Sequence, residues 1–328
     1  MLMKRIFVLL NVLALCLVLS ACAETGMKPL ESGRVRKQET LLTVDGRGVD
    51  ASTYLYWLTT ICRTLEKQYV DAGIPLDWSD CLQQGTLGDY AKNQALRSVA
   101  LYATVENWAE QYGCKIAEEK QAQVIEQWEE KIAAYGREQT YLELLAERGL
   151  DRTGAERMAE DHALYMELCA LAETEGSPLY AADEELAEFF SERGYLTMQL
   201  LEFTGESAVE RAAETFSLLN RSAEPEVEFD VRGGTEQTVL ATDGGLPQAL
   251  IAAAEVLEPG QMSGILEAEK GCYTILLRAA DDLFAVRLPY LDHLLQTAAD
   301  RAKILVTEDY KNLNVELLWE NELSAEEP

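Results

Sequence analysis

Apolar residues recur with a helical period over the first half of this chain. Between Gly88 and Gly113, a stripe spaced at i, i+4, i+7, i+8 and i+11 predicts one buried face of a long helix. The stripe consists of Leu101, Val105, Trp108, Ala109 and Tyr112. The pattern therefore predicts a helix that packs on a core through this face.

Capping signals divide the same region into several helices. Thr86 and Asp89 have the spacing of a capping box, with Asp in place of the usual Glu. Gly113, Gly136 and Gly149 each follow an apolar-periodic segment, where a helix ends in a left-handed residue. We predict a mainly helical domain over residues 41–193.

Two short segments near the ends of the chain have a strand pattern instead. Residues 41–44 are a β-type run followed by the turn residues 45–48. After a predicted helix at 290–313, Val315, Leu317 and Trp319 fall at every second position, as in a half-buried strand. An isolated strand of this length is unstable. We expect the two strands to pair, so that residues 286–321 return to the helical domain and residues 322–328 form a tail.

The segment between them has a mixed period. Residues 196–203 and 272–277 predict strands, residues 208–219 and 247–257 predict helices, and residues 227–239 are ambiguous. This order predicts a small α/β module over residues 194–285, inserted into the helical domain. The fold class is therefore α+β.

The N-terminus has the organisation of a secretory signal. Lys4 and Arg5 precede an apolar run at residues 6–19, which is too short to span a bilayer. Leu19-Ser20-Ala21-Cys22 resembles the lipobox of bacterial lipoproteins. The resemblance implies that residues 1–21 are removed, that Cys22 is lipidated and that residues 22–40 form a flexible tether; an ordinary signal peptide is the alternative.

Composition narrows the function classes. The chain has 57 acidic and 28 basic residues, a net charge of −29, which disfavours nucleic acid and anionic lipid as ligands. The charge has two readings: solubility outside the cell, or attraction of cationic unfolded polypeptides.

The histidine and cysteine residues do not form a pattern typical of a catalytic or metal-binding site. His162 and His293 are isolated, and the cysteines show no Cys-x-x-Cys spacing. No metal or cofactor is predicted. Cys62 and Cys81 are interpreted either as small packing residues or as a disulfide around an intervening loop.

Two segments carry a family resemblance. The first is Val44-Asp45-Gly46-Arg47-Gly48-Val49-Asp50 before an aromatic helix. The second is Leu257-Glu258-Pro259-Gly260-Gln261-Met262-Ser263-Gly264, followed by Gly271-Cys272-Tyr273-Thr274-Ile275-Leu276-Leu277. They resemble extracytoplasmic foldases of the PrsA and SurA type, in which a helical chaperone domain flanks a parvulin-like peptidyl-prolyl isomerase module.

The resemblance implies a degenerate proline pocket. Leu246 and Leu250 stand where parvulins usually have Met and Phe, Ser263 matches a family serine, and Gln199 and Tyr273 replace the two family histidines. The resemblance leaves two outcomes: an isomerase activity through a rewired hydrogen-bond network, or a retired domain whose residues only complete a core.

The function that follows is a membrane-anchored extracytoplasmic foldase or chaperone that binds unfolded secreted chains. Tyr54, Tyr56, Trp57 and Trp108 are candidates to line a client-binding cradle, with a role in the core as the alternative. The competing functions are a solute-binding lipoprotein of a transporter and a cell-envelope scaffold that uses a relic parvulin domain.

Overall fold

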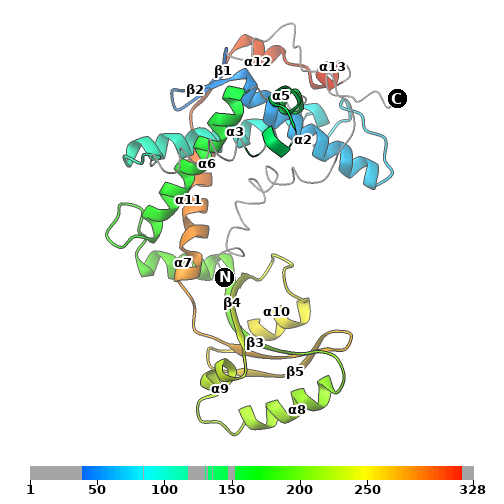
Figure 1. Ribbon diagram of the computed structural model, residues 1–328, viewed down its shortest axis with the longest axis vertical. Coiled ribbons are helices and arrows are strands. Elements are labelled where there is room, and N and C mark those ends of the chain that lie inside the picture. Colours follow the sequence, from blue (N-terminus) through cyan, green and yellow to red (C-terminus); the bar gives the residue numbers. More distant parts are fainter. Residues whose placement is uncertain are drawn as a thin grey trace. The chain divides into compact units, whose positions relative to one another are not determined.

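The computed structural model describes residues 39–83, 85–116, 130, 132–134, 136–146 and 152–319. The chain divides into two compact units (Figure 1). Unit 1 comprises the chain up to Leu179 and from Leu291 onward, and unit 2 comprises Tyr180–Tyr290. Both units combine helices with a small antiparallel sheet, which confirms the α+β class.

Unit 1 contains a three-stranded sheet in the order β2-β1-β7. Its strands are β1 (Thr40–Val44), β2 (Arg47–Asp50) and β7 (Ile304–Val306). Asp45 and Gly46 join β1 to β2 with φ of 51° and 88°, the positive values that a tight two-residue hairpin requires. The Asp45 carboxylate also accepts a 2.8 Å hydrogen bond from the Lys303 N–H, which fixes the start of β7.

The predicted partner of β1 was wrong, although the predicted return of the chain to the first domain is confirmed. β7 pairs with β1, whereas Val315–Leu318 is a short helix, α13, capped by the Asn314 side chain. Val315 is buried and Leu317 is 53% exposed, so the two do not share one face as they would in a strand. The predicted helix at 290–313 is also divided, into α11 (Arg287–Arg301) and α12 (Glu308–Asn312) with β7 between them.

In the described part of unit 1, further helices are α2 (Ala51–Asp71), α3 (Leu87–Gln111), α5 (Glu138–Ala146) and α6 (Arg152–Glu173). The Thr86–Asp89 capping box at the start of α3 is confirmed. α2 and α6 both pack against α3.

The aromatic residues of α2 belong to the core. Tyr54, Tyr56 and Trp57 are all buried, and the Trp57 ring lies 5.1 Å from the ring of Tyr102 on α3. The cradle interpretation is therefore wrong for these three residues. Trp108 is half-buried, with its ring 6.0 Å from that of Tyr112.

The C-terminal segment is fastened to the helices of unit 1. The Lys92 ammonium on α3 donates to the carbonyl oxygens of Leu313 at 2.9 Å and Tyr310 at 3.3 Å. The Tyr310 ring also lies 5.2 Å from the buried ring of Tyr54. These contacts close the helical unit with residues that are more than 200 positions apart in sequence.

Unit 2 is built on a four-stranded antiparallel sheet in the order β4-β3-β6-β5. The elements in chain order are α7 (Asp183–Arg193), β3 (Tyr195–Phe203), α8 (Ala208–Leu219), α9 (Pro225–Val231), β4 (Thr235–Leu240), α10 (Gln248–Glu255), β5 (Met262–Glu269), β6 (Cys272–Arg278) and the 3₁₀ turn η3 (Phe284–Val286). β4 lies in the segment whose period was ambiguous. β5 was not predicted.

In unit 2, α10 covers one face of the sheet and α8 and α9 cover the other (Figure 1), and each face has its own apolar core. Met198, Leu200 and Leu276 face α10, whereas Leu201, Ile275 and Leu277 face α8 and α9. Alternate residues of β3 and β6 therefore contribute to opposite cores, as the period of a strand requires. α7 adds a third cluster with η3, which places the start of this compact unit before residue 194.

Several predictions from the N-terminus concern residues outside the described ranges. These are the signal peptide, lipidation at Cys22 and the tether up to residue 38. Within the described ranges, no helix combines the length and apolarity needed to cross a bilayer. Cys62 and Cys81 are both free thiols, the first buried and the second exposed.

Candidate functional site

The five residues of the predicted proline pocket do not meet at one place. Leu250 is 1% exposed in the core between the sheet and α10, and Leu246 packs against the same core. Gln199 and Tyr273 occupy strand positions in phase with Leu201 and Ile275, which belong to the core on the opposite face. The binding role of each residue stays a prediction, as does a weak isomerase activity.

Gln199 is held by two carboxylates. Its Nε2 donates to Asp230 Oδ1 at 3.1 Å on α9 and to Glu236 Oε2 at 3.3 Å on β4. The residue is 7% exposed, and its Oε1 is buried without a hydrogen-bond partner in the structure. The amide nitrogen of Gln199 therefore donates to two carboxylates within unit 2, while the amide oxygen has no hydrogen-bond partner among the described residues.

Ser263 supports the sheet. Its hydroxyl donates to the Gly264 carbonyl oxygen at 2.7 Å and accepts from the Leu276 N–H at 2.9 Å. The register of β5 against β6 shifts between Met262 and Ile265. The serine oxygen therefore accepts the hydrogen bond from the Leu276 N–H that a backbone carbonyl of β5 would accept in a regular ladder. The hydroxyl thereby satisfies a buried backbone donor.

Unit 1 contains a cleft of about 640 Å³ that sequence reasoning missed. Its walls come from α3, α6, the start of β2 and residues 114–116. The lining side chains comprise five carboxylates, two guanidinium groups and five neutral or apolar groups: Glu106, Glu110, Glu156, Glu160, Asp161, Arg47, Arg157, Ala109, Cys114, Ile116, Thr153 and Leu164.

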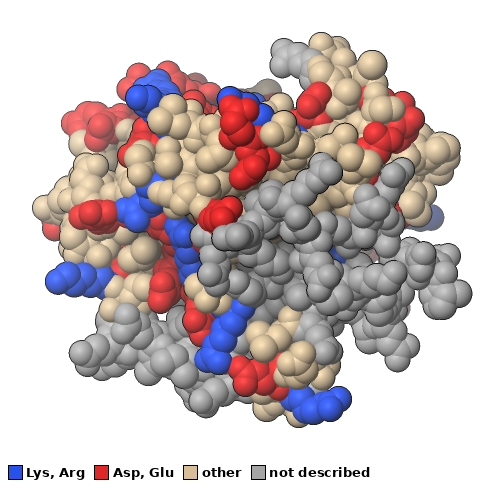
Figure 2. Space-filling model, turned by 90° about the horizontal axis from the view of Figure 1, so that it is seen from above, with Lys and Arg blue, Asp and Glu red and all other residues tan. Residues whose placement is uncertain are grey.

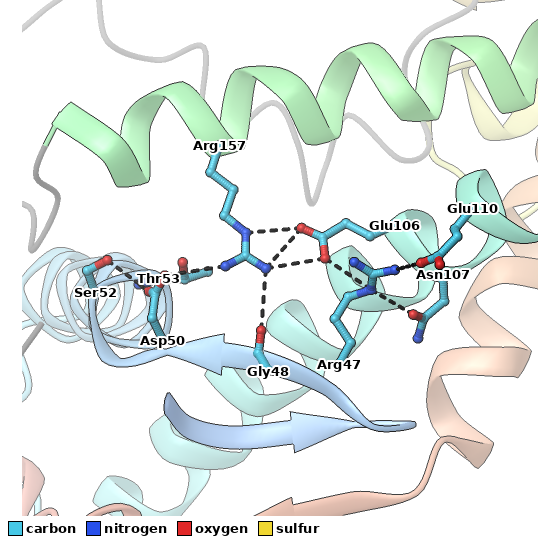
Figure 3. Close-up of polar contacts among 9 residues, drawn as sticks. All are labelled: Arg47, Gly48, Asp50, Ser52, Thr53, Glu106, Asn107, Glu110 and Arg157. Atoms are coloured by element: carbon cyan, nitrogen blue, oxygen red, sulfur yellow. Dashed lines mark hydrogen bonds and ion pairs between the residues drawn. The ribbon is translucent and has the colours of Figure 1, made fainter. Parts of the chain in front are cut away.

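Arg157 connects the walls of this cleft (Figure 3). From α6, its guanidinium donates to both carboxylate oxygens of Glu106 on α3, at 3.0 and 3.2 Å. It also donates to Asp50 Oδ2 at 3.3 Å, and the same Asp50 side chain caps α2 through its other oxygen. One side chain thus ties α6 to α3 and to the start of α2, with the bidentate geometry that arginine offers to carboxylates.

Arg47 extends the network along α3 (Figure 3). Its Nε lies 3.3 Å from Glu106 Oε2 and donates to Asn107 Oδ1 at 2.6 Å, and its terminal nitrogen pairs with Glu110. Glu106 is only 9% exposed and therefore has two guanidinium partners. Two arginines from separate elements compensate one nearly buried charge.

Asp161 supplies a second buried carboxyl beside Glu106. It is 3% exposed. Burial, together with the charge of Glu106 and a hydrogen bond to it, raises the pKa of Asp161 to about 9. Burial beside Glu106 therefore favours the protonated form of Asp161, in which its hydroxyl can donate a hydrogen bond to Glu106.

A sequence signal for the cleft exists in α6. Thr153, Glu156, Glu160 and Leu164 recur at spacings of three and four, which places them on one helix face. The same spacing is typical of a solvated charged face, so it does not distinguish a cleft wall from ordinary surface. The pairing of Arg157 with Glu106, 51 positions away, is visible only in the folded chain.

The chain is similar to several solved structures. No protein-family model matches the chain, and no curated protein matches it. Solved structures similar to it include foldase protein PrsA from Streptococcus pneumoniae, with 16% identity, coverage of 76% of this chain and 92% of that chain, and a TM-score of 0.27. PrsA from Lactococcus lactis is 12% identical, with coverage of 87% of this chain and 100% of that chain and a TM-score of 0.29.

A structure of a SurA-like chaperone from Campylobacter jejuni is a further neighbour, with 11% identity, coverage of 82% of this chain and 99% of that chain, and a TM-score of 0.24. The first two of these structures are named as foldase proteins and the third as a SurA-like chaperone.

Proposed function

We propose that the chain is a folding factor that binds segments of unfolded polypeptides in the cleft of unit 1. The observation that carries this proposal is the mixed lining of the cleft, in which acidic side chains occur together with the apolar Ile116 and Leu164. Such a surface suits segments that contain both basic and apolar residues, without requiring one particular sequence.

The charge of the chain supports the same function. The net charge of the chain is −29, and on the described part of the face shown in Figure 2 acidic side chains are interspersed with basic ones. Long-range attraction of this kind raises the encounter rate with cationic chains. Unfolded cationic polypeptides are therefore the preferred clients.

Location outside the cytoplasm and anchoring through Cys22 are part of the proposal. The lipobox and the following polar residues would hold the cleft near a membrane across which polypeptides emerge. Mass spectrometry of the protein purified from membranes tests this step: a diacylated Cys22 as the first residue supports it, and an unmodified Cys22 contradicts it.

A solute-binding lipoprotein is less favoured. A protein of that class closes two α/β lobes around its ligand, whereas the described part of unit 1 is mainly helical with one three-stranded sheet. Crosslinking from the cleft residues distinguishes a folding factor from a cell-envelope scaffold. Crosslinks to one folded partner indicate a scaffold, and crosslinks to many unrelated unfolded chains indicate a folding factor.

The folding-factor proposal predicts suppression of client aggregation. Light scattering of reduced, denatured lysozyme, which is cationic, should fall in the presence of the protein, and scattering of an anionic client should fall less. Glu160→Lys reverses one exposed charge in the cleft and should reduce suppression by about half, since a charge pair at the surface contributes about 1 kcal/mol.

Glu173→Lys is the matched control, because Glu173 lies exposed on the same helix outside the cleft lining. It should suppress aggregation as the wild type does. Absence of suppression for both clients by the wild type would refute the proposed function. Equal losses in the two variants would refute the cleft as the binding site.

A further inference from the structure

The two edge strands of the unit 2 sheet differ in how they are protected. β5 has two register shifts against β6 and carries exposed Glu267 and Glu269 near its end. Bulges and charges of this kind prevent another strand from pairing with an edge. β4, by contrast, keeps an unbroken register with β3 over all six of its residues.

The backbone groups on the outer side of β4 follow from the register. The Ala241 N–H bonds the Gly194 carbonyl, so this pair and every second pair along the two strands is hydrogen-bonded. The Thr197 carbonyl on β3 accepts from the Ala279 N–H on the other side, which agrees with this phase. Glu236, Thr238 and Leu240 are therefore in the pairs whose N–H and C=O groups point away from β3.

These outward groups are largely unused. The Leu240 carbonyl accepts from the Asp243 N–H at 3.0 Å. Within the described ranges, the outward N–H and C=O groups of Glu236 and Thr238 make no backbone hydrogen bond, and neither does the Leu240 N–H. They form a row of alternating donors and acceptors at the spacing of a β-strand.

Two carboxylates accompany this row. Asp230 and Glu236 both accept from the Gln199 amide, and both are exposed. In the described part of the chain, neither takes part in a recorded ion pair with Lys or Arg. The Gln199 Oε1 next to them is buried and unpaired. The edge therefore presents uncompensated negative charge together with unsatisfied backbone groups.

We propose that the outer edge of β4 binds an extended segment of an unfolded polypeptide, which adds to the sheet as a further strand with a basic side chain beside Glu236. The proposal rests on the proposed function and adds a second contact with the client, in unit 2. Backbone pairing is independent of client sequence, because every non-proline residue has the same N–H and C=O groups.

Thr238 gives a substitution that removes one outward donor and leaves the sheet intact. Its N–H points away from β3, so Thr238→Pro breaks no bond of the β3–β4 ladder, and proline is tolerated on edge strands in this orientation. The ring also occupies the space of an added strand. Thr238→Val is the matched control: it keeps the N–H and loses only the hydroxyl contact with Thr197 at 2.9 Å.

The probe is a fluorescein-labelled peptide of ten alternating valines and lysines, and the readout is fluorescence anisotropy with the full mature chain. Thr238→Val should bind within about twofold of the wild type, and Thr238→Pro should bind at least about tenfold more weakly, because a lost backbone bond and a steric block act together. Binding to Thr238→Pro at wild-type affinity overturns the proposal.

A second measurement uses the wild-type protein only and stays decisive even if Thr238→Pro does not fold. The same peptide with every amide of its central residues N-methylated keeps its charge and side chains, but its central backbone can no longer donate hydrogen bonds. It should bind at least about tenfold more weakly than the unmethylated peptide. Equal binding overturns the proposal.

Two further outcomes separate this proposal from neighbouring ones. Wild-type dimers that form without peptide and disappear in Thr238→Pro would assign the edge to a second copy of the chain and overturn the proposal. Full suppression of lysozyme aggregation by Thr238→Pro would refute the β4 edge while leaving the folding function of the cleft intact.

Discussion

Replacing Arg157 by methionine is expected to lower the free energy of unfolding of unit 1 by about 2 to 3 kcal/mol. Methionine retains most of the apolar stem of arginine but lacks the guanidinium that donates to Glu106 and Asp50. Glu106 is 9% exposed, so its charge loses a bidentate partner where water replaces it poorly. This loss of stability is smaller than for a fully buried ion pair, because the Arg157 side chain is 29% exposed.

Urea unfolding followed by tryptophan fluorescence measures this change. The sequence of unit 2 contains no tryptophan, and Trp57, Trp78, Trp108 and Trp319 lie in the described part of unit 1, so the signal reports unit 1. Arg152→Met is the control, because Arg152 is on the same helix and its ion pairs with Glu138 and Glu156 are about half exposed. It should cost less than about 1 kcal/mol. Equal losses for both variants would contradict a special role of the Arg157 network.

Local signals predicted several elements correctly because neighbouring residues determine them. Asp45-Gly46 specifies a tight turn wherever it occurs between two strands, and Thr86 with Asp89 caps α3 through contacts three residues apart. The β3 strand was predicted because its two faces are both apolar. In each case the information lies within about ten residues.

The errors arose where distant residues decide the structure. Val315 and Trp319 are separated by four positions, which fits a helical turn as well as a strand, and the cap at Asn314 favoured the helix. β7 has only three residues and is stabilised by β1, about 260 positions away. No local pattern distinguishes such a strand from the end of a helix.

The candidate site was predicted less well than the fold. Leu246, Leu250, Gln199, Ser263 and Tyr273 all lie in unit 2, but the alternation of strand faces separates Gln199 and Tyr273 from the two leucines. A motif predicts on which strand a residue lies. The face of the sheet on which its side chain lies depends on the strand register. The cleft of unit 1 depends on charge pairs between α3 and α6, which no spacing in the sequence reveals.

The second large effect is a dependence of stability on pH that Asp161 causes. The pKa of Asp161 is raised from an ordinary value near 4 to about 9 in the folded protein, first by burial and then by Glu106. Between these values the folded state holds a proton that the unfolded state releases. The contribution of Asp161 to stability is therefore complete below about pH 4 and declines as the pH rises toward about 9.

Asp161→Asn should remove this decline. The amide has the shape of the protonated carboxyl, can donate to Glu106 and does not ionise. We expect the variant to match the wild type within about 1 kcal/mol at pH 4 and to be more stable by at least about 2 kcal/mol at pH 8, since one bound proton changes the free energy by about 1.4 kcal/mol per pH unit.

Urea unfolding of both proteins at pH 4, 6 and 8, again followed by tryptophan fluorescence, gives the difference directly. Glu160→Gln serves as the control, because Glu160 is the preceding residue on α6 and is exposed; its difference from the wild type should stay within about 0.5 kcal/mol at all three pH values. Stability curves of wild type and Asp161→Asn that run parallel from pH 4 to pH 8 would show that Asp161 is ionised in the folded protein. Its charge would then have to be compensated by Arg157, and the hydrogen bond from its hydroxyl to Glu106 would be absent.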